Sequence, residues 1–167
     1  MLFLWKFTHG WQFIAIFASW IIFIVYCTII YLHSCGTKTP FDSLFQFMGE
    51  RDEFPGEGAL WYLLGLMLIF SFLDRFLFII TAIYILAVGD SISAIFSYKS
   101  QHKYSFFKGR TWLSYLAFIV FTLPVTIFVG AKAIPLILIC AVIESLNIRI
   151  NDNFLIPLTC VIYLLLV

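Results

Sequence analysis

Long apolar runs separated by short polar stretches extend through the whole chain. Polar and apolar residues do not alternate along these runs as they do in barrel strands, so the pattern predicts α-helices. Most runs approach the roughly 20 residues that a helix needs to cross a bilayer. The predicted fold class is therefore all-α, a polytopic transmembrane helix bundle of about six spans. The spans are predicted at residues 11–32, 58–73, 76–97, 111–129, 133–146 and 154–167.

The overall composition strengthens this prediction. Hydrophobic residues make up 63% of the 167 residues and charged residues only 11%, whereas soluble domains are about 25% charged. A chain of this length has room for one bundle, so residues 1–167 are expected to form a single integral membrane domain. The net charge of +1 gives no indication of nucleic-acid binding.

Smaller signals refine the expected helices. Pro124 predicts a kink in the fourth span, and residues 130–132 predict a tight turn before the fifth. An apolar segment, residues 1–8, precedes the first span, and Gly10 leaves a re-entrant turn open there. The four cysteines have neither CxxC nor zinc-site spacing, so a structural disulfide is not expected.

The basic residues predict the orientation in the membrane. With six spans, the polar stretches 34–57, 98–110 and 147–153 lie on one side and carry seven of the ten Lys and Arg residues. The other side carries Lys6, Arg75 and Lys132. Because cytoplasmic loops are enriched in Lys and Arg, these three stretches are expected in the cytoplasm. The seven residues are Lys38, Arg51, Lys99, Lys103, Lys108, Arg110 and Arg149.

Asp90 is the residue that an apolar span accommodates least easily. It lies within the predicted third span, where a carboxylate costs roughly 2.5 kcal/mol or more to insert. A residue of this kind usually faces a polar cavity, a partner or a metal, and it therefore marks a candidate functional site. The alternative is a structural pair between Asp90 and a Ser or Lys of a neighbouring helix.

Further carboxylates are expected near Asp90. The third and fifth spans both run toward the cytoplasm, which places Asp90 about 10 Å below that surface and Glu144 close to it. Asp152 follows in the next polar stretch, beside the amide of Asn153. Carboxylate oxygens bind hard cations such as Mg²⁺, which keep substrate phosphates as further ligands, and Lys and Arg neutralise the remaining phosphate charge. The pattern favours a divalent cation carrying a polyphosphate, with a solvated charged loop that only fixes topology as the alternative.

Four segments of the chain resemble sequence motifs in a fixed order. Residues 58–66, GALWYLLGL, resemble G(A/V)LWYxLG, and residues 89–94, GDSISA, resemble GD(S/T)xAA. Residues 110–118 resemble K(S/T)xxGSxAxF, and Glu144 with residues 152–157, DNFLIP, resembles E…DNFxIP. Residues 6–9 are also similar to an N-terminal RKxxH. With these motifs the chain resembles the CTP-dependent lipid kinases, the family of dolichol kinase, phytol kinase and the yeast-type diacylglycerol kinase.

The resemblance implies a kinase that transfers a phosphoryl group from CTP to a membrane lipid alcohol, such as a diacylglycerol or polyprenol, with Mg²⁺ as cofactor. Asp90 would be the catalytic residue, either as a metal ligand or as acceptor of the hydroxyl proton. Glu144 and Asp152 would be the further metal ligands. Nucleotide or phosphate contacts are assigned to Lys103, Lys108, Arg110, Thr111 and Asn153, and the further candidates are Glu53, Glu57, Ser91, Lys6 and His9.

The chain also departs from the family pattern. Ser97, and Ser100 or Gln101, stand where the family has glycines, and Ser114-Tyr115 replace a Gly-Ser pair. Glycines there would let backbone amides approach phosphates closely. Two alternatives therefore accompany the kinase: a related cytidylyltransferase that makes a CDP-lipid, and a membrane paralogue without catalytic activity. The sequence names neither the lipid nor the oligomeric state, and an oligomer is compatible with it.

Overall fold

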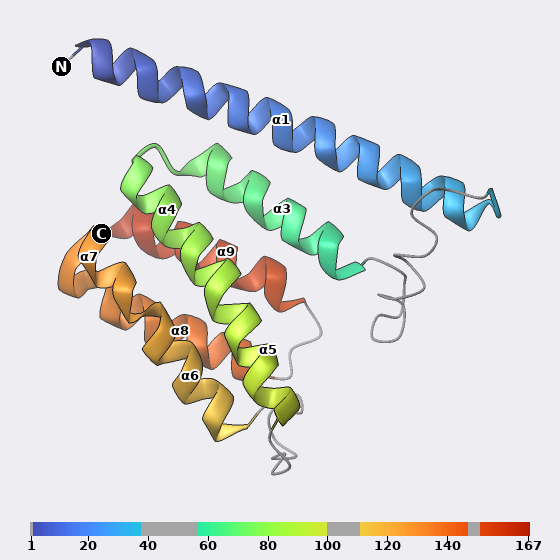
Figure 1. Ribbon diagram of the computed structural model, residues 1–167. Coiled ribbons are helices and arrows are strands. Elements are labelled where there is room, and N and C mark those ends of the chain that lie inside the picture. The colour runs from blue at the N-terminus through green and yellow to red at the C-terminus, as the bar shows by residue number, and fades with distance from the viewer. Residues whose placement is uncertain (1, 38–56, 100–110, 147–150) are drawn as a thin grey trace.

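The computed structural model describes residues 2–37, 57–99, 111–146 and 151–167. These parts of the chain are helical, and no β-strand occurs within them, so the all-α prediction is confirmed. The first helix, α1 (Leu2–Ser34), runs without interruption past Gly10, where the sequence left a turn open. It lies alongside α3 (Glu57–Phe72), which begins and ends within one residue of the predicted second span (Figure 1).

One long helical stretch carries Asp90. It consists of α4 (Phe76–Tyr84), a π-helical turn η1 (Ile85–Gly89) and α5 (Asp90–Lys99). The sequence predicted the extent of this span but not the π-turn, in which the backbone hydrogen bonds skip one residue more than in an α-helix. Asp90 is the first residue after the turn.

The C-terminal half forms a helical hairpin followed by a last helix. The first arm is α6 (Trp112–Thr122), a 3₁₀ turn η2 (Leu123–Val125) and α7 (Thr126–Val129), and the turn includes Pro124 as the sequence predicted. The chain then reverses in η3 (Gly130–Lys132), where Gly130 has φ +69°, a conformation that glycine adopts readily. The second arm, α8 (Ala133–Ser145), packs back against α6, and α9 (Asp152–Leu166) follows.

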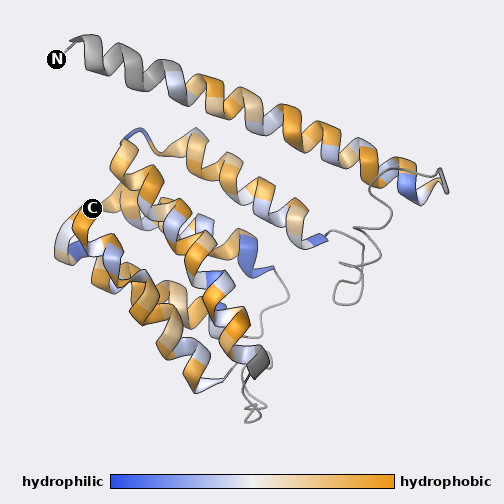
Figure 2. Cartoon of the chain, viewed as in Figure 1, coloured by the Kyte–Doolittle hydropathy of each residue, from blue (hydrophilic) through white to orange (hydrophobic). Residues whose placement is uncertain are grey.

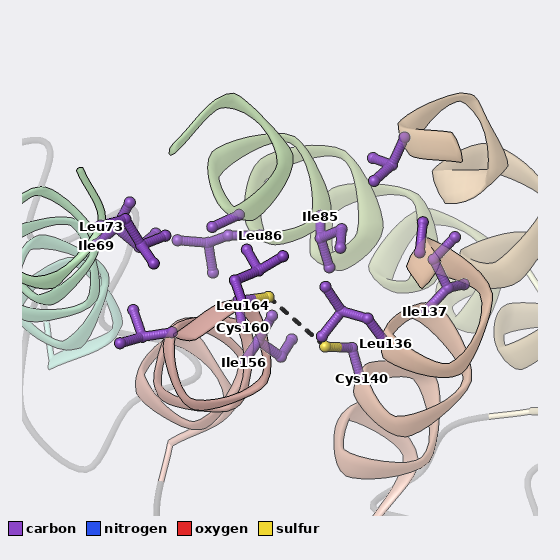
Figure 3. Packing of buried hydrophobic residues seen from close by; sticks show 14 of the residues in the cluster. Ile69, Leu73, Ile85, Leu86, Leu136, Ile137, Cys140, Ile156, Cys160 and Leu164 are labelled. Atoms are coloured by element: carbon purple, nitrogen blue, oxygen red, sulfur yellow. Dashed lines mark hydrogen bonds between the residues drawn. The ribbon is translucent and has the colours of Figure 1, made fainter. Parts of the chain in front are cut away.

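Apolar side chains from several of these helices form the core. Figure 3 shows Ile69 of α3, Leu86 of η1, Leu136 of α8 and Ile156 of α9 packed together, all with 0% exposure. Within the core, the sulfur atoms of Cys140 and Cys160 lie 3.7 Å apart as free thiols. These two cysteines therefore serve as small buried side chains of the core.

Hydrophobic residues predominate along the described helices (Figure 2), and many of them are exposed. Phe17 of α1 is 72% exposed and Ile127 of α7 is 82% exposed. Three helical stretches are long and apolar enough to cross a membrane, Phe13–Ser34, Phe76–Ser97 and Trp112–Ser145, while α3 and α9 are apolar but shorter. The chain is therefore a membrane protein whose exposed helix faces suit contact with lipid.

Candidate functional site

Three carboxylates from three separate helices meet at one end of the bundle. Asp90 begins α5, Glu144 lies in the last turn of α8, and Asp152 is the first residue of α9. One oxygen atom of each lies within 4.8 Å of the other two. We call these three residues the carboxylate cluster. The sequence predicted that they belong together, and the structure places them side by side.

Glu144 is the most deeply buried member of the cluster, with an exposed fraction of 2%. Its Oε1 accepts a hydrogen bond of 2.7 Å from the Ser93 hydroxyl, which is itself 1% exposed. Ser93 follows Asp90 by three residues, so the two side chains share one face of α5. This hydrogen bond therefore joins α8 to the helix that carries Asp90.

The backbone before Asp90 is shaped by a close contact with α6. A Cβ atom at Gly89 would lie 2.4 Å from Cε2 of Phe118, a fully buried ring. Only glycine leaves room for the ring at this point, and the π-turn η1 ends at the same residue. Turns of this type shift all later side chains around the helix axis and are frequent at functional sites. The π-turn and the contact between Gly89 and Phe118 together set the direction in which the Asp90 side chain points from α5.

A second close contact positions the N-terminal end of α9. A Cβ atom at Gly65 would lie 2.6 Å from Cγ of Pro157, so α3 and α9 approach closely there. Nearer the cluster, the rings of Trp61 and Phe154 pack with centroids 5.5 Å apart. The side-chain amide of Asn153 donates to the Gly58 carbonyl at 3.3 Å. The segments 58–66 and 152–157, which the sequence singled out separately, thus pack against each other.

The start of α9 carries the polar groups of the site. Asn151 caps the helix by accepting from the Asn153 backbone N–H at 3.0 Å, and an Asp152 oxygen accepts from the same group at 3.1 Å. A carboxylate in the first turn is stabilised by the positive end of the helix dipole. The Oδ1 atom of Asn153 is buried and has no hydrogen-bond partner in the described part of the chain. This oxygen is a further potential ligand beside the cluster.

Tyr62 of α3 adds an aromatic hydroxyl to the surroundings. Its ring packs against the apolar core, and it lies close enough to Asp90 for the two groups to interact electrostatically. The site is therefore bordered by α3, α5, α8 and α9.

The cluster geometry suits a divalent cation. Two ionised carboxylates at 4.8 Å repel each other by roughly 3.5 kcal/mol at an effective dielectric constant of about 20, and a bound cation removes this repulsion. Ligands on opposite sides of an ion are separated by about 4.2 Å for Mg²⁺ and about 4.8 Å for Ca²⁺, since metal–oxygen distances are about 2.1 and 2.4 Å. Three oxygens cannot all lie opposite one another, so at separations of up to 4.8 Å they would move closer together on binding one ion. Oxygen ligands are those that hard cations prefer.

The other predicted site residues are distributed as follows. Thr111 is 5% exposed and caps α6, where its side chain accepts from the Ser114 backbone N–H at 3.2 Å. Glu57 accepts a 2.9 Å hydrogen bond from the Trp61 ring, and Ser91 is exposed. Lys6 and His9 belong to α1, but their side chains are not among those described. Glu53, Lys103, Lys108 and Arg110 lie outside the described residues.

Four residues of the site were not named as site residues from the sequence: Ser93, Gly65, Gly89 and Tyr62. For Ser93 the signal was present, because its spacing of three from Asp90 puts it on the same helix face. The two glycines lay within segments already singled out, and a glycine inside a helix often marks a close helix approach. Nothing in the sequence distinguished Tyr62 from other membrane tyrosines.

Comparisons with known proteins give one relative. No family model and no solved structure matches the chain. A protein of Methanocaldococcus jannaschii, described as "Uncharacterized protein MJ1137", is 32% identical to this chain over 111 residues. The match covers 65% of this chain and 58% of the relative. The similarity shows that a related sequence exists in an archaeon, and the description of that protein names no activity.

Proposed function

We propose that this protein is a CTP-dependent kinase that phosphorylates a membrane lipid alcohol of the diacylglycerol or polyprenol type. The observation that carries the proposal is the carboxylate cluster, three acidic side chains from three helices in an otherwise apolar bundle. The segments that resemble the lipid kinases also make the contacts around this cluster, through Ser93, Gly58 and Asn153. The choice of CTP over ATP follows from the resemblance alone.

The proposal includes six membrane spans, with α3 and α9 completing the set formed by α1, α4–α5, α6–α7 and α8. Residues 34–57, 98–110 and 147–153 would then lie in the cytoplasm, because they carry most of the Lys and Arg residues. The chain would be a multi-pass protein with the carboxylate cluster toward its cytoplasmic side. Residues 100–110, which include Lys103, Lys108 and Arg110, connect α5 to α6 in the sequence.

The acidic residues would bind the metal ion, and the basic residues would bind the phosphates. Asp90, Glu144 and Asp152 would hold Mg²⁺, which when bound supplies positive charge to the phosphates of the nucleotide. Lys103, Lys108 and Arg110 would neutralise the remaining phosphate charge. Catalysis of this kind consists mainly of positioning and charge stabilisation. Asn153 and Thr111 stay the predicted nucleotide contacts.

The reaction would join the lipid oxygen to the γ-phosphorus of CTP. A lipid alcohol would approach between helices from the bilayer, and its hydroxyl oxygen would attack the γ-phosphorus. The bond between that phosphorus and the β,γ-bridging oxygen would break, which releases CDP. The hydroxyl proton would pass to Asp90 when this carboxylate is the base, or to water when Asp90 is only a metal ligand.

The direct test uses the purified protein in detergent with labelled CTP or ATP, Mg²⁺ and a panel of lipid alcohols. The kinase releases CDP and a phosphorylated lipid. A cytidylyltransferase would instead need a phosphatidic-acid-like lipid and would release pyrophosphate and a CDP-lipid. Absence of any phosphorylated lipid, with no response of the melting temperature to nucleotide, would favour a membrane paralogue without catalytic activity.

Asp90→Asn separates a functional role from a structural one. The change removes the charge and keeps the volume, so transfer activity should fall at least about 100-fold while the melting temperature is retained. Asp74→Asn is the matched control, because Asp74 is an exposed carboxylate in the turn between α3 and α4. Retained activity with a lower melting temperature for Asp90→Asn would contradict the catalytic assignment.

A further inference from the structure

A cavity lies at the opposite end of the bundle from the carboxylate cluster. It has a volume of about 580 Å³ and is lined by the start of α4, by α7 and η3, and by the C-terminal end of α9. These segments gather at one end of the molecule in Figure 1. The volume lies within the range of about 300–1,000 Å³ that is usual for ligand pockets. We call this cavity the basic groove, because Arg75 and Lys132 line it.

The two basic residues come from different turns of the chain. Arg75 precedes α4, and its guanidinium group lies 5.2 Å from the centroid of the Phe78 ring. Lys132 ends η3, and its Nζ donates to the backbone oxygen of Val167 at 3.2 Å. Both side chains are exposed, and the neighbouring Asp74 is not part of the lining. Two positively charged side chains therefore line the groove, and its lining contains no carboxylate side chain.

The rest of the lining is apolar. Apart from Arg75 and Lys132, every lining residue is Phe, Leu or Val, including Phe128 of α7 and Leu164 of α9. The Tyr163 hydroxyl donates to the Lys132 carbonyl at 2.8 Å, which fixes η3 against α9. A ligand that fits this lining has an anionic head and an apolar tail. Lys and Arg side chains bind phosphate through charge-assisted hydrogen bonds, so the pair suits the phosphate of an anionic lipid.

We propose that the basic groove binds an anionic phospholipid from the surrounding bilayer. Its phosphate lies between Arg75 and Lys132, and the first part of an acyl chain lies against Phe128 and Leu164. The turns that form the groove contain polar residues at the end of an apolar bundle, which is where a phospholipid headgroup is found. This site is separate from the carboxylate cluster and does not depend on the proposed kinase activity.

The test measures lipid binding to the full chain in detergent, by native mass spectrometry and by the melting temperature. Phosphatidylglycerol should bind more tightly than phosphatidylcholine of the same acyl chains. The double variant Arg75→Gln/Lys132→Gln should weaken binding of phosphatidylglycerol roughly 30-fold, since each basic residue near a membrane surface contributes about a factor of five. The charge-preserving variant Arg75→Lys/Lys132→Arg should retain most of the affinity.

Two controls keep the result specific. Lys38→Gln/Arg51→Gln removes the same net charge from another part of the chain and should leave tight binding intact. Val129→Trp keeps both charges but fills the groove, so it should also weaken binding. Equal affinity for the two lipids, or unchanged binding by the Arg75/Lys132 double variant, would overturn the proposal. Equally tight binding of glycerol 3-phosphate would overturn it too, because that ligand has the headgroup chemistry without acyl chains.

Discussion

Glu144→Gln tests cation binding by the carboxylate cluster without any need for turnover. Glutamine has nearly the same shape as glutamate, and its carbonyl oxygen can still accept the hydrogen bond that Ser93 donates at 2.7 Å. The substitution therefore removes one negative charge and retains the packing of a side chain that is 2% exposed. What changes is the repulsion with Asp90 and Asp152.

The expected magnitude follows from the distances. Each pair of ionised carboxylates at the 4.8 Å limit contributes roughly 3.5 kcal/mol of repulsion at an effective dielectric constant of about 20, and a shorter separation gives more. In EDTA, Glu144→Gln should therefore melt at the same temperature as the wild type or higher. A ligand at 100 times its Kd stabilises the folded state by about 2.7 kcal/mol, so Mg²⁺ should raise the melting temperature of the wild type. The variant should lose most of this rise.

The assay is thermal unfolding in detergent, with EDTA or with increasing Mg²⁺, followed by tryptophan fluorescence. Asp74→Asn serves as the control for a lost charge, and its response to Mg²⁺ should equal that of the wild type. The reasoning is refuted if Glu144→Gln melts well below the wild type in EDTA and both respond equally to Mg²⁺. Glu144 would then act only as the structural partner of Ser93.

Three further substitutions test the packing around the site. Gly65→Ala places a Cβ atom 2.6 Å from the Pro157 ring. The overpacking should lower the free energy of unfolding by roughly 1–3 kcal/mol, although Ala is favoured over Gly in a helix by roughly 1 kcal/mol. An unchanged melting temperature would contradict the contact. Gly89→Ala meets Phe118 at 2.4 Å and should lower both stability and transfer activity, with Phe118→Leu restoring part of the stability in a double-mutant cycle. Thr111→Val removes the side chain that caps α6 and should cost about 1 kcal/mol in unfolding experiments, whereas Thr111→Ser should not; equal losses in both would argue against the cap.

The positions of most helices were predictable from the sequence, because helix ends and breaks depend on residues that are close together in the chain. Hydropathy located α3 and α9 to within two residues at their N-terminal ends, since the polar groups of Glu57 and Asp152 mark where apolar runs begin. Pro124 located the break between α6 and α7, because proline cannot donate the backbone hydrogen bond of a helix interior. The continuity of α1 through Gly10 was not evident, since a glycine in an apolar run fits either a helix or a turn.

The site was predictable only in part, because its geometry depends on contacts between helices. The charge of Asp90 in an apolar run, together with the expected topology, was enough to associate it with Glu144 and Asp152. The hydrogen bond from Ser93 and the π-turn before Asp90 depend on how α5 meets α6 and α8. A hydropathy pattern records which positions are apolar, and it carries no information about which helix a given face meets.

The lengths of neighbouring helices have a consequence for the bilayer. α1 and α3 lie side by side, yet they contain 33 and 16 residues, or about 50 and 24 Å at 1.5 Å per residue. The hydrocarbon core is about 30 Å thick, so α1 has length to spare for tilting, while α3, α8 with 13 residues and α9 with 15 residues are too short. In the six-span arrangement, the two leaflets must approach each other around α3 and α9, and one end of α9 carries Asp152. Hydrophobic mismatch would then bring lipid headgroups toward the carboxylate cluster, and the acyl-chain length of the surrounding membrane would become a variable of the proposed kinase reaction.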